Sequence, residues 1–143
     1  MNFLDSNLIG VLTCNMSFLK NFKLDFFIGG FSGDNIKIKN NGNELEVGIS
    51  DNPAPNPMNI YSHLINNNQW QEFWEEIDEQ GIWNWKNSYT DNTIRDGTQW
   101  ELNLEKDGKI KKTWGSNDYP ENFDMFIKSI NKIAKTSISD EDY

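Results

Sequence analysis

Alternation of apolar and polar residues marks two hairpins in this chain. Ile36 to Lys39 alternates, turns at an Asn-Gly pair, and alternates again from Leu45 to Ile49. An Asn-Gly pair between two such runs predicts a β-hairpin, because both residues accept the positive φ that the turn needs. We expect one face of this hairpin to be buried, with Ile36, Ile38, Leu45, Val47 and Ile49 on it.

A second hairpin is predicted near the C-terminal end. Trp100 to Glu105 alternates, Asp107-Gly108 supplies a turn, and the chain returns from Lys109 to Trp114. Trp100 alternates with two leucines, so we expect its ring in the core. An aromatic-rich run, Phe22 to Ile28, ends at a Gly-Gly pair and predicts one more strand.

A different period, close to 3.6 residues, predicts two amphipathic helices. The first runs from about Asn68 to Gln80, with Asn68 and Gln71 as an N-terminal cap pair and Gly81 just past its end. The second follows Pro120, which suits a first helical turn. Their apolar stripes are Trp70, Phe73, Trp74 and Ile77 in the first, and Phe123, Phe126, Ile127, Ile130 and Ala134 in the second.

These elements predict an α+β fold, in which an antiparallel sheet of four to five strands is packed on one face by the two helices. Residues 51–57 hold three prolines and are expected to form a loop from sheet to helix. We expect a single domain over 22–136. Residues 1–21 are then a leader or an extra strand, and 137–143 an acidic, frayed tail.

Composition limits the cellular setting. The single cysteine, Cys14, cannot form an intramolecular disulfide, which favours a reducing cytoplasm. The apolar run Leu8 to Cys14 is short and no basic residue precedes Lys20, so we expect no signal peptide. No run of residues reaches the length of a membrane span, and we expect no membrane partner.

Charge is strongly segregated along the chain, whose net charge is −9. No lysine or arginine occurs between Lys39 and Lys86, whereas eight carboxylates do, four of them on the outward side of the first helix: Glu72, Glu75, Glu76 and Glu79. A one-signed surface selects partners of opposite charge, although a solvated helix face is the simpler interpretation. We therefore expect a basic protein partner, and no direct binding to nucleic acid, whose phosphates require Lys and Arg.

A block of aromatic and polar residues offers an alternative site. If exposed, its rings would stack on a sugar or a nucleotide base; if buried, they would simply roof the core. A Gly-Ser-Asn turn ahead of the last helix would either bind an anion or cap that helix. The candidate ligand-binding residues are Trp83, Trp85, Tyr89, Trp114, Ser116, Asn117 and Tyr119.

The same block carries several motifs in order: Trp83-Asn84-Trp85, then Asp96-Gly97-Thr98-Gln99-Trp100, then Gly115-Ser116-Asn117-Asp118-Tyr119-Pro120. Here the chain resembles an uncharacterised family of small bacterial proteins, in which Trp-x-Trp, Asp-Gly-x-x-Trp and Gly-Ser-Asn-x-Tyr-Pro segments recur in this order. The resemblance covers Gln69 to Phe126, with a looser likeness over Phe27 to Phe31. It implies an α+β domain and no assigned function, so it supplies no catalytic residues.

Catalytic signals are weak. Asp96 and Glu101 could act as an acid-base pair, but nothing in their spacing places them together. His63 is the only histidine, so a zinc site is not expected, and a Cys14–His63 nucleophile pair has no surrounding signature. The chain lacks a P-loop and a dinucleotide fingerprint. We predict neither a metal nor a cofactor.

The sequence thus favours a non-catalytic acidic protein-binding module, such as a bacterial or phage inhibitor or immunity-type protein that acts on a basic partner like a nuclease. A small-ligand binding domain built on the aromatic block is the first alternative. A hydrolase that uses Asp96 or Glu101 is the second. The oligomeric state is left open.

Overall fold

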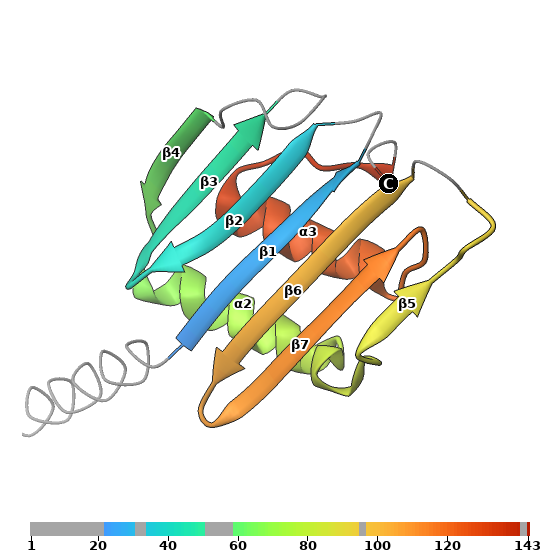
Figure 1. Ribbon diagram of the computed structural model, residues 1–143. Coiled ribbons are helices and arrows are strands. Elements are labelled where there is room, and N and C mark those ends of the chain that lie inside the picture. The colour runs from blue at the N-terminus through green and yellow to red at the C-terminus, as the bar shows by residue number, and fades with distance from the viewer. Residues whose placement is uncertain (1–21, 31–33, 51–58, 95–96, 141–142) are drawn as a thin grey trace, which may run out of the picture.

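The computed structural model describes residues 22–30, 34–50, 59–94, 97–140 and 143. Within these ranges the chain forms a seven-stranded sheet and two α-helices (Figure 1). The α+β class is therefore confirmed. The elements in chain order are β1 (Phe22–Gly30), β2 (Asn35–Asn41), β3 (Glu44–Ser50), β4 (Asn59–Leu64), α2 (Asn67–Glu79), the 3₁₀ helix η1 (Ile82–Asn84), β5 (Ser88–Thr90), β6 (Thr98–Lys106), β7 (Lys109–Ser116) and α3 (Phe123–Ala134).

The strand order is β4-β3-β2-β1-β6-β7-β5. Both predicted hairpins are present, as β2–β3 and β6–β7, and β1 lies between them, antiparallel to both β2 and β6. The register pairs Phe26 with Ile38 on one side and with Leu102 on the other. The two hairpins therefore present their apolar residues on one continuous face.

The predicted number of strands was too low, because β4 and β5 were missed. Neither strand carries an alternating pattern: most residues of β4 are exposed, and β5 has three residues. β5 pairs with β7 in parallel, so the sheet is mostly rather than wholly antiparallel. The predicted loop over 51–57 lies outside the described residues.

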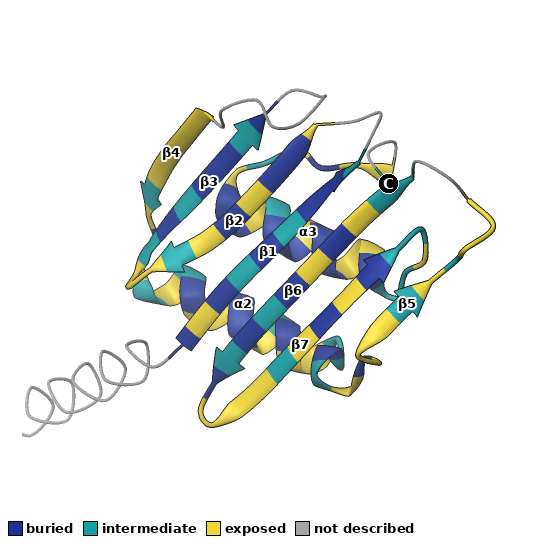
Figure 2. Ribbon diagram, in the orientation of Figure 1, coloured by how far each residue is buried: buried dark blue, intermediate teal, exposed yellow. Residues whose placement is uncertain are grey.

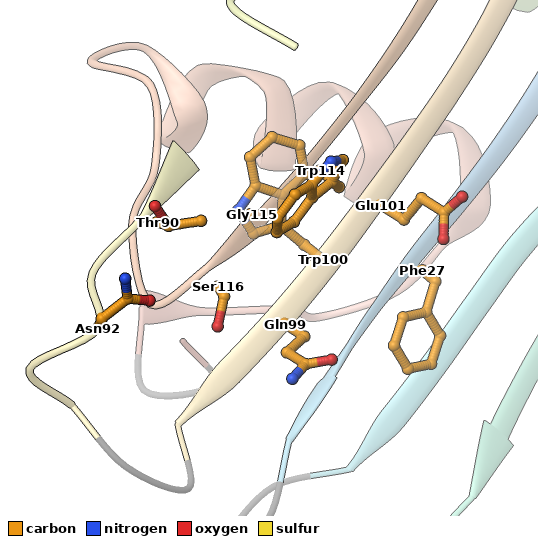
Figure 3. Close-up of a pocket in the computed structure, with 9 residues that line it drawn as sticks. All are labelled: Phe27, Thr90, Asn92, Gln99, Trp100, Glu101, Trp114, Gly115 and Ser116. Carbon is orange, nitrogen blue, oxygen red and sulfur yellow. The ribbon is translucent and has the colours of Figure 1, made fainter. Parts of the chain in front are cut away.

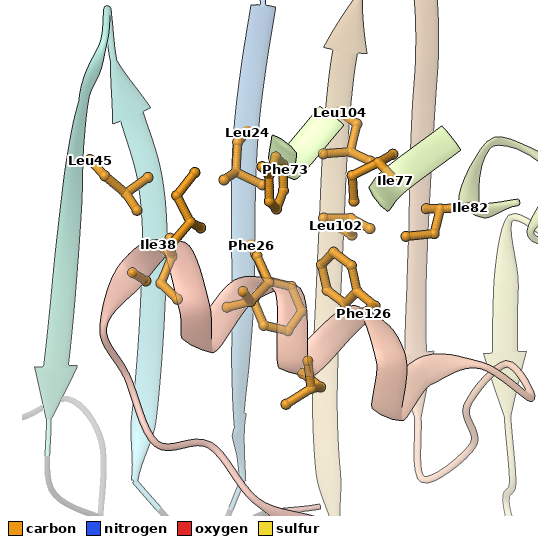
Figure 4. Close-up of a cluster of buried hydrophobic side chains, with 14 of the residues drawn as sticks. Leu24, Phe26, Ile38, Leu45, Phe73, Ile77, Ile82, Leu102, Leu104 and Phe126 are labelled. Atoms are coloured by element: carbon orange, nitrogen blue, oxygen red, sulfur yellow. The ribbon is translucent and has the colours of Figure 1, made fainter. Parts of the chain in front are cut away.

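Both helices cover the same face of the sheet (Figure 1). Buried and exposed residues alternate along the central strands, so the other face is open to solvent (Figure 2). Leucine, isoleucine and phenylalanine side chains of the strands meet Phe73 and Ile77 of α2 and Phe126 of α3 (Figure 4). Phe26 and Phe126 pack edge to face, with ring centroids 5.1 Å apart. Trp100 lies in this core, as predicted, and its indole N–H donates to the Asp118 carbonyl at 2.9 Å.

α2 begins at Asn67, one residue before the predicted start, and its capping residue is Asn66, two residues before the predicted cap Asn68. The Asn66 side chain accepts from the Gln69 N–H at 2.8 Å, and the Gln69 side chain accepts from the Asn66 N–H at 3.0 Å. This reciprocal pair satisfies two backbone donors that the helix leaves free. Gly81 follows the helix with φ of 69°, as predicted for a residue just past the end.

α3 lies beside α2 and runs antiparallel to it, as contacts of Gln80 with Met125 and of Glu72 with Lys132 show. It starts at Phe123, so Pro120 precedes the helix instead of lying in its first turn. Asn122 joins three segments: its side chain accepts from the Trp85 indole at 2.8 Å and donates to the Gln80 carbonyl.

The described residues of the acidic tail are held against the domain. Ile138 is buried, and the Asn131 side chain bonds both its N–H and its carbonyl. The Tyr143 ring packs on Tyr119 and Phe123, and its hydroxyl donates to Asp124. Burial and the Asp124 carboxylate raise the pKa of Tyr143. At these points the tail is not frayed, in contrast to the prediction.

Phe26 and Phe27 are sequence neighbours on opposite faces of β1, so they test which face the helices cover. Phe26 is fully buried and Phe27 is half-buried. We expect Phe26→Ala to lower the free energy of unfolding by about 3–5 kcal/mol, the usual cost of a large cavity. Phe27→Ala should cost about 1 kcal/mol, because less apolar area returns to water. Urea unfolding followed by circular dichroism would measure both, and equal losses would contradict the one-sided core.

Candidate functional site

The outward side of α2 carries the four glutamates predicted to bind a partner. Trp70, Phe73, Trp74 and Ile77 fix the orientation of the helix by burying its opposite side. Glu72, Glu75 and Glu79 are exposed, and Glu76 is half-buried beside α3. We call these four residues the acidic face of α2.

Lys132 of α3 neutralises part of this face. Its ammonium lies 2.8 Å from a Glu72 oxygen and 2.5 Å from a Glu76 oxygen. The other Glu76 oxygen accepts from the Ser129 hydroxyl at 2.7 Å. The pKa of Lys132 is raised, chiefly by its hydrogen bond to Glu72 and secondly by its hydrogen bond to Glu76. The acidic face is therefore partly neutralised, and not one-signed as the sequence led us to expect.

On the other side of α2, Lys109 of the second hairpin reaches Asp78. The two charged groups are 3.8 Å apart, and the Trp83 indole N–H donates to the same Asp78 oxygen at 2.7 Å. The Lys109 ammonium also lies 5.4 Å from the centre of the Trp83 ring. A lysine thus stands at each flank of the helix.

Glu75 and Glu79 lie between these flanks, one helical turn apart. Within the described ranges no lysine, arginine or histidine comes within 4 Å of either carboxylate. Their charges are therefore uncompensated by direct contact.

The predicted aromatic platform does not form one exposed surface. Trp85 is buried among Trp100, Phe123 and Phe126. Trp83 is half-buried and stacks on Trp74, with ring centroids 6.3 Å apart.

The other residues of the predicted ligand site are also spread over several environments. The Tyr89 ring packs on Trp100, and its hydroxyl accepts from the Lys86 N–H at 2.9 Å. Tyr119 packs on Phe123, and burial raises its pKa. Asn117 has φ of 60° and its amide donates to the Ile94 carbonyl at 3.3 Å. These three side chains thus serve the fold.

The last two of the predicted ligand-binding residues are Trp114 and Ser116, and both line a hollow on the open face of the sheet (Figure 3). Trp114 is 48% exposed, which is exceptional for the tryptophans of this chain. The hollow has a volume of about 500 Å³, and its walls include Phe27, Gln99 and Glu101. This grouping could not be predicted from the sequence, because the strands that carry Phe27 and Glu101 are far apart in the chain.

Among the described residues, the structure offers little support for the catalytic alternative. Glu101 lies on the open face and Asp96 lies outside the described residues. His63 contacts Tyr61, with ring centroids 5.1 Å apart, and Cys14 is also outside the described residues. The described residues hold no group of three or more His, Cys, Asp or Glu that could bind a metal ion. None of their helices is long and apolar enough to cross a membrane.

Comparison with known proteins gives no family assignment. The chain matches no protein-family model, and no curated protein matches it significantly. The resemblance noted for the aromatic motifs therefore stays a prediction.

The Lys132 ion pairs should contribute modestly to stability. We expect Lys132→Met to lower the free energy of unfolding by about 1 kcal/mol or less at neutral pH, since the side chains of Lys132 and Glu72 are largely exposed. Because the pKa of Lys132 is raised in the folded protein, this contribution should be complete below the ordinary lysine pKa. It should disappear as the pH rises through the folded-state pKa.

Lys128 lies one turn before Lys132 and, among the described residues, forms no ion pair, so Lys128→Met is the matched control. Urea unfolding at neutral and at strongly alkaline pH would compare the two variants. A Lys132→Met effect that does not shrink in alkali would contradict the assigned pairing.

Proposed function

We propose that this protein is a non-catalytic protein-binding module whose acidic face of α2 binds a basic protein. The observation that carries the proposal is the uncompensated pair Glu75 and Glu79, exposed on the side of the helix turned away from the sheet. A carboxylate that already has a cationic neighbour gains little interaction energy from a second cation. Among the described residues, the Glu75 and Glu79 carboxylates have no such neighbour and remain available to a partner.

The charge balance around α2 supports the same conclusion. The helix carries five carboxylates and, among the residues that the structure describes, two lysines contact them, which leaves a charge of −3 on these groups together. The whole chain has a net charge of −9, which adds a long-range field of the same sign. Such a field accelerates encounter with a basic partner and repels acidic ones.

Lys132 also prepares the surface. By holding Glu72 and Glu76 close to α3, it orders two carboxylate side chains that would otherwise be free to rotate. Side chains that are already ordered lose less conformational entropy when a partner binds. The ion pairs therefore reduce the charge of the face while they increase its rigidity.

A protein is a better partner than a nucleic acid, because the phosphate backbone is itself negative. A basic protein that binds nucleic acid, such as a nuclease, offers a complementary surface. An acidic protein that covers that surface would act as an inhibitor or an immunity-type protein, of bacterial or phage origin.

Charge reversal tests the proposal. Wild-type protein and the double variant Glu75→Lys, Glu79→Lys would be immobilised and exposed to an extract of the native host, with bound proteins identified by mass spectrometry. We expect the wild type to retain a basic protein that the double variant fails to retain, and retention to weaken with salt.

The matched control is Asp34→Lys with Glu105→Lys, which changes the net charge equally at positions away from α2. It should retain the partner, because the local surface is intact. If the α2 variant retains the partner as well as the wild type does, or if both double variants lose it equally, the acidic face of α2 is not the binding surface.

A further inference from the structure

The open face of the sheet places a carboxylate between two aromatic rings. In the strand register, Glu101 of β6 is paired with Phe27 of β1 on one side and with Trp114 of β7 on the other. Paired residues of neighbouring strands point to the same face, with Cβ atoms about 5 Å apart. We call these three residues the Trp114 site, and Figure 3 shows them around one hollow.

The Glu101 carboxylate has spare bonding capacity. Among the described residues its hydrogen-bond donor is the Asn103 amide, at 3.3 Å from one of its oxygens. No lysine or arginine of the described ranges lies within 4 Å of it. An ionised carboxylate accepts about four hydrogen bonds, so most of its acceptor sites face solvent or a ligand.

There is space for a ligand beside this carboxylate. The hollow of about 500 Å³ lies on one side of Trp114 and a second hollow of about 480 Å³ lies on the other. Glu101 and Trp114 line both. A side chain that enters from solvent can therefore reach the carboxylate and the indole ring together.

We propose that the Trp114 site binds an arginine side chain of a second protein. A guanidinium group can donate two parallel hydrogen bonds to a carboxylate and stack its plane on an indole ring. Lysine offers a point charge and fits this combination less well. Phosphate groups, and hence nucleotides, are disfavoured because Glu101 is negative.

The Trp114 site is separate from the acidic face of α2. It lies on the open side of the sheet, whereas α2 covers the opposite side (Figure 1). The inference therefore goes beyond the proposed function and does not depend on it.

We expect Lys112 to compete with the ligand. Lys112 is paired with Asn103, two residues along each strand from the Glu101–Trp114 pair and on the same face, and it lines the second hollow together with Lys111. Its ammonium can swing toward Glu101 when the site is empty. Removal of the Lys112 charge should therefore strengthen arginine binding. A site that binds arginine by stacking alone would not show this effect.

The test is a titration of the ¹⁵N-labelled full chain with the peptide acetyl-Gly-Arg-Gly-amide at low salt. The uncharged isostere acetyl-Gly-citrulline-Gly-amide and the sugar maltose serve as comparison ligands. The Trp114 indole signal is assigned from its absence in Trp114→Phe. We expect the arginine peptide to shift the Trp114 indole signal and the amides of Phe27 and Glu101, and citrulline to shift them little.

Variants add a second measure. Glu101→Gln should weaken arginine binding about tenfold, because it removes the charge but keeps the shape. Lys112→Gln should strengthen it about twofold or more. Glu75→Lys with Glu79→Lys should leave binding at the Trp114 site unchanged.

Several results would overturn the inference without affecting the proposed function. These are equal binding of citrulline and arginine, an unchanged affinity in Glu101→Gln, or shifts confined to α2. A larger response to maltose than to arginine would assign the site to carbohydrate instead. Conversely, arginine binding at Trp114 would support this inference even if partner capture survived charge reversal of α2. That second result would contradict the proposed function.

Discussion

Aromatic packing between the helices and the inner face of the sheet determines which side chains of this protein reach solvent. Phe22 lies 4.5 Å from Trp70 of α2, and Phe26 lies 5.1 Å from Phe126 of α3, measured between ring centroids. Each buried ring removes on the order of 150–250 Å² from water. Because the rings come from the inner sides of both helices, the acidic residues of α2 must point outward.

The same constraint creates the open face of the sheet. Two helices cover one side of seven strands, and every strand residue that does not point toward them belongs to the other side. Glu101 and Trp114 are exposed there because their neighbours Leu102 and Thr113 are buried. Both candidate surfaces are thus consequences of one packing arrangement, on opposite sides of the molecule.

Local patterns in the sequence were sufficient for the central elements. Alternation and turn residues gave both hairpins, and the 3.6-residue period gave both helices. The cap of the first helix was misplaced by two residues because Asn66, Asn67 and Asn68 are all good caps. The choice of Asn66 puts Ile65 just before the cap and Trp70 four residues into the helix, and both are buried. The exposed edge strand β4 has no buried face and therefore left no pattern to detect.

Long-range pairings could not be read from the sequence. Lys132 and Glu72 are separated by 60 positions, so the partial neutralisation of α2 depends on how the two helices pack. The grouping of Phe27 with Glu101 likewise depends on β1 pairing with β6 rather than with another strand. The sequence located a cluster of carboxylates on the first helix, but only the tertiary fold shows which of these carboxylates have a cationic neighbour.

Asn122 has a consequence for the dynamics of the domain. Its side chain joins the carbonyl of Gln80, at the end of α2, to the indole of Trp85, just after η1, while its own backbone starts α3. Opening any one of these segments breaks a hydrogen bond of the others, so the three should exchange their amide hydrogens as one cooperative unit. The short edge strand β4, whose residues are mostly exposed, lacks such a tie and should exchange sooner.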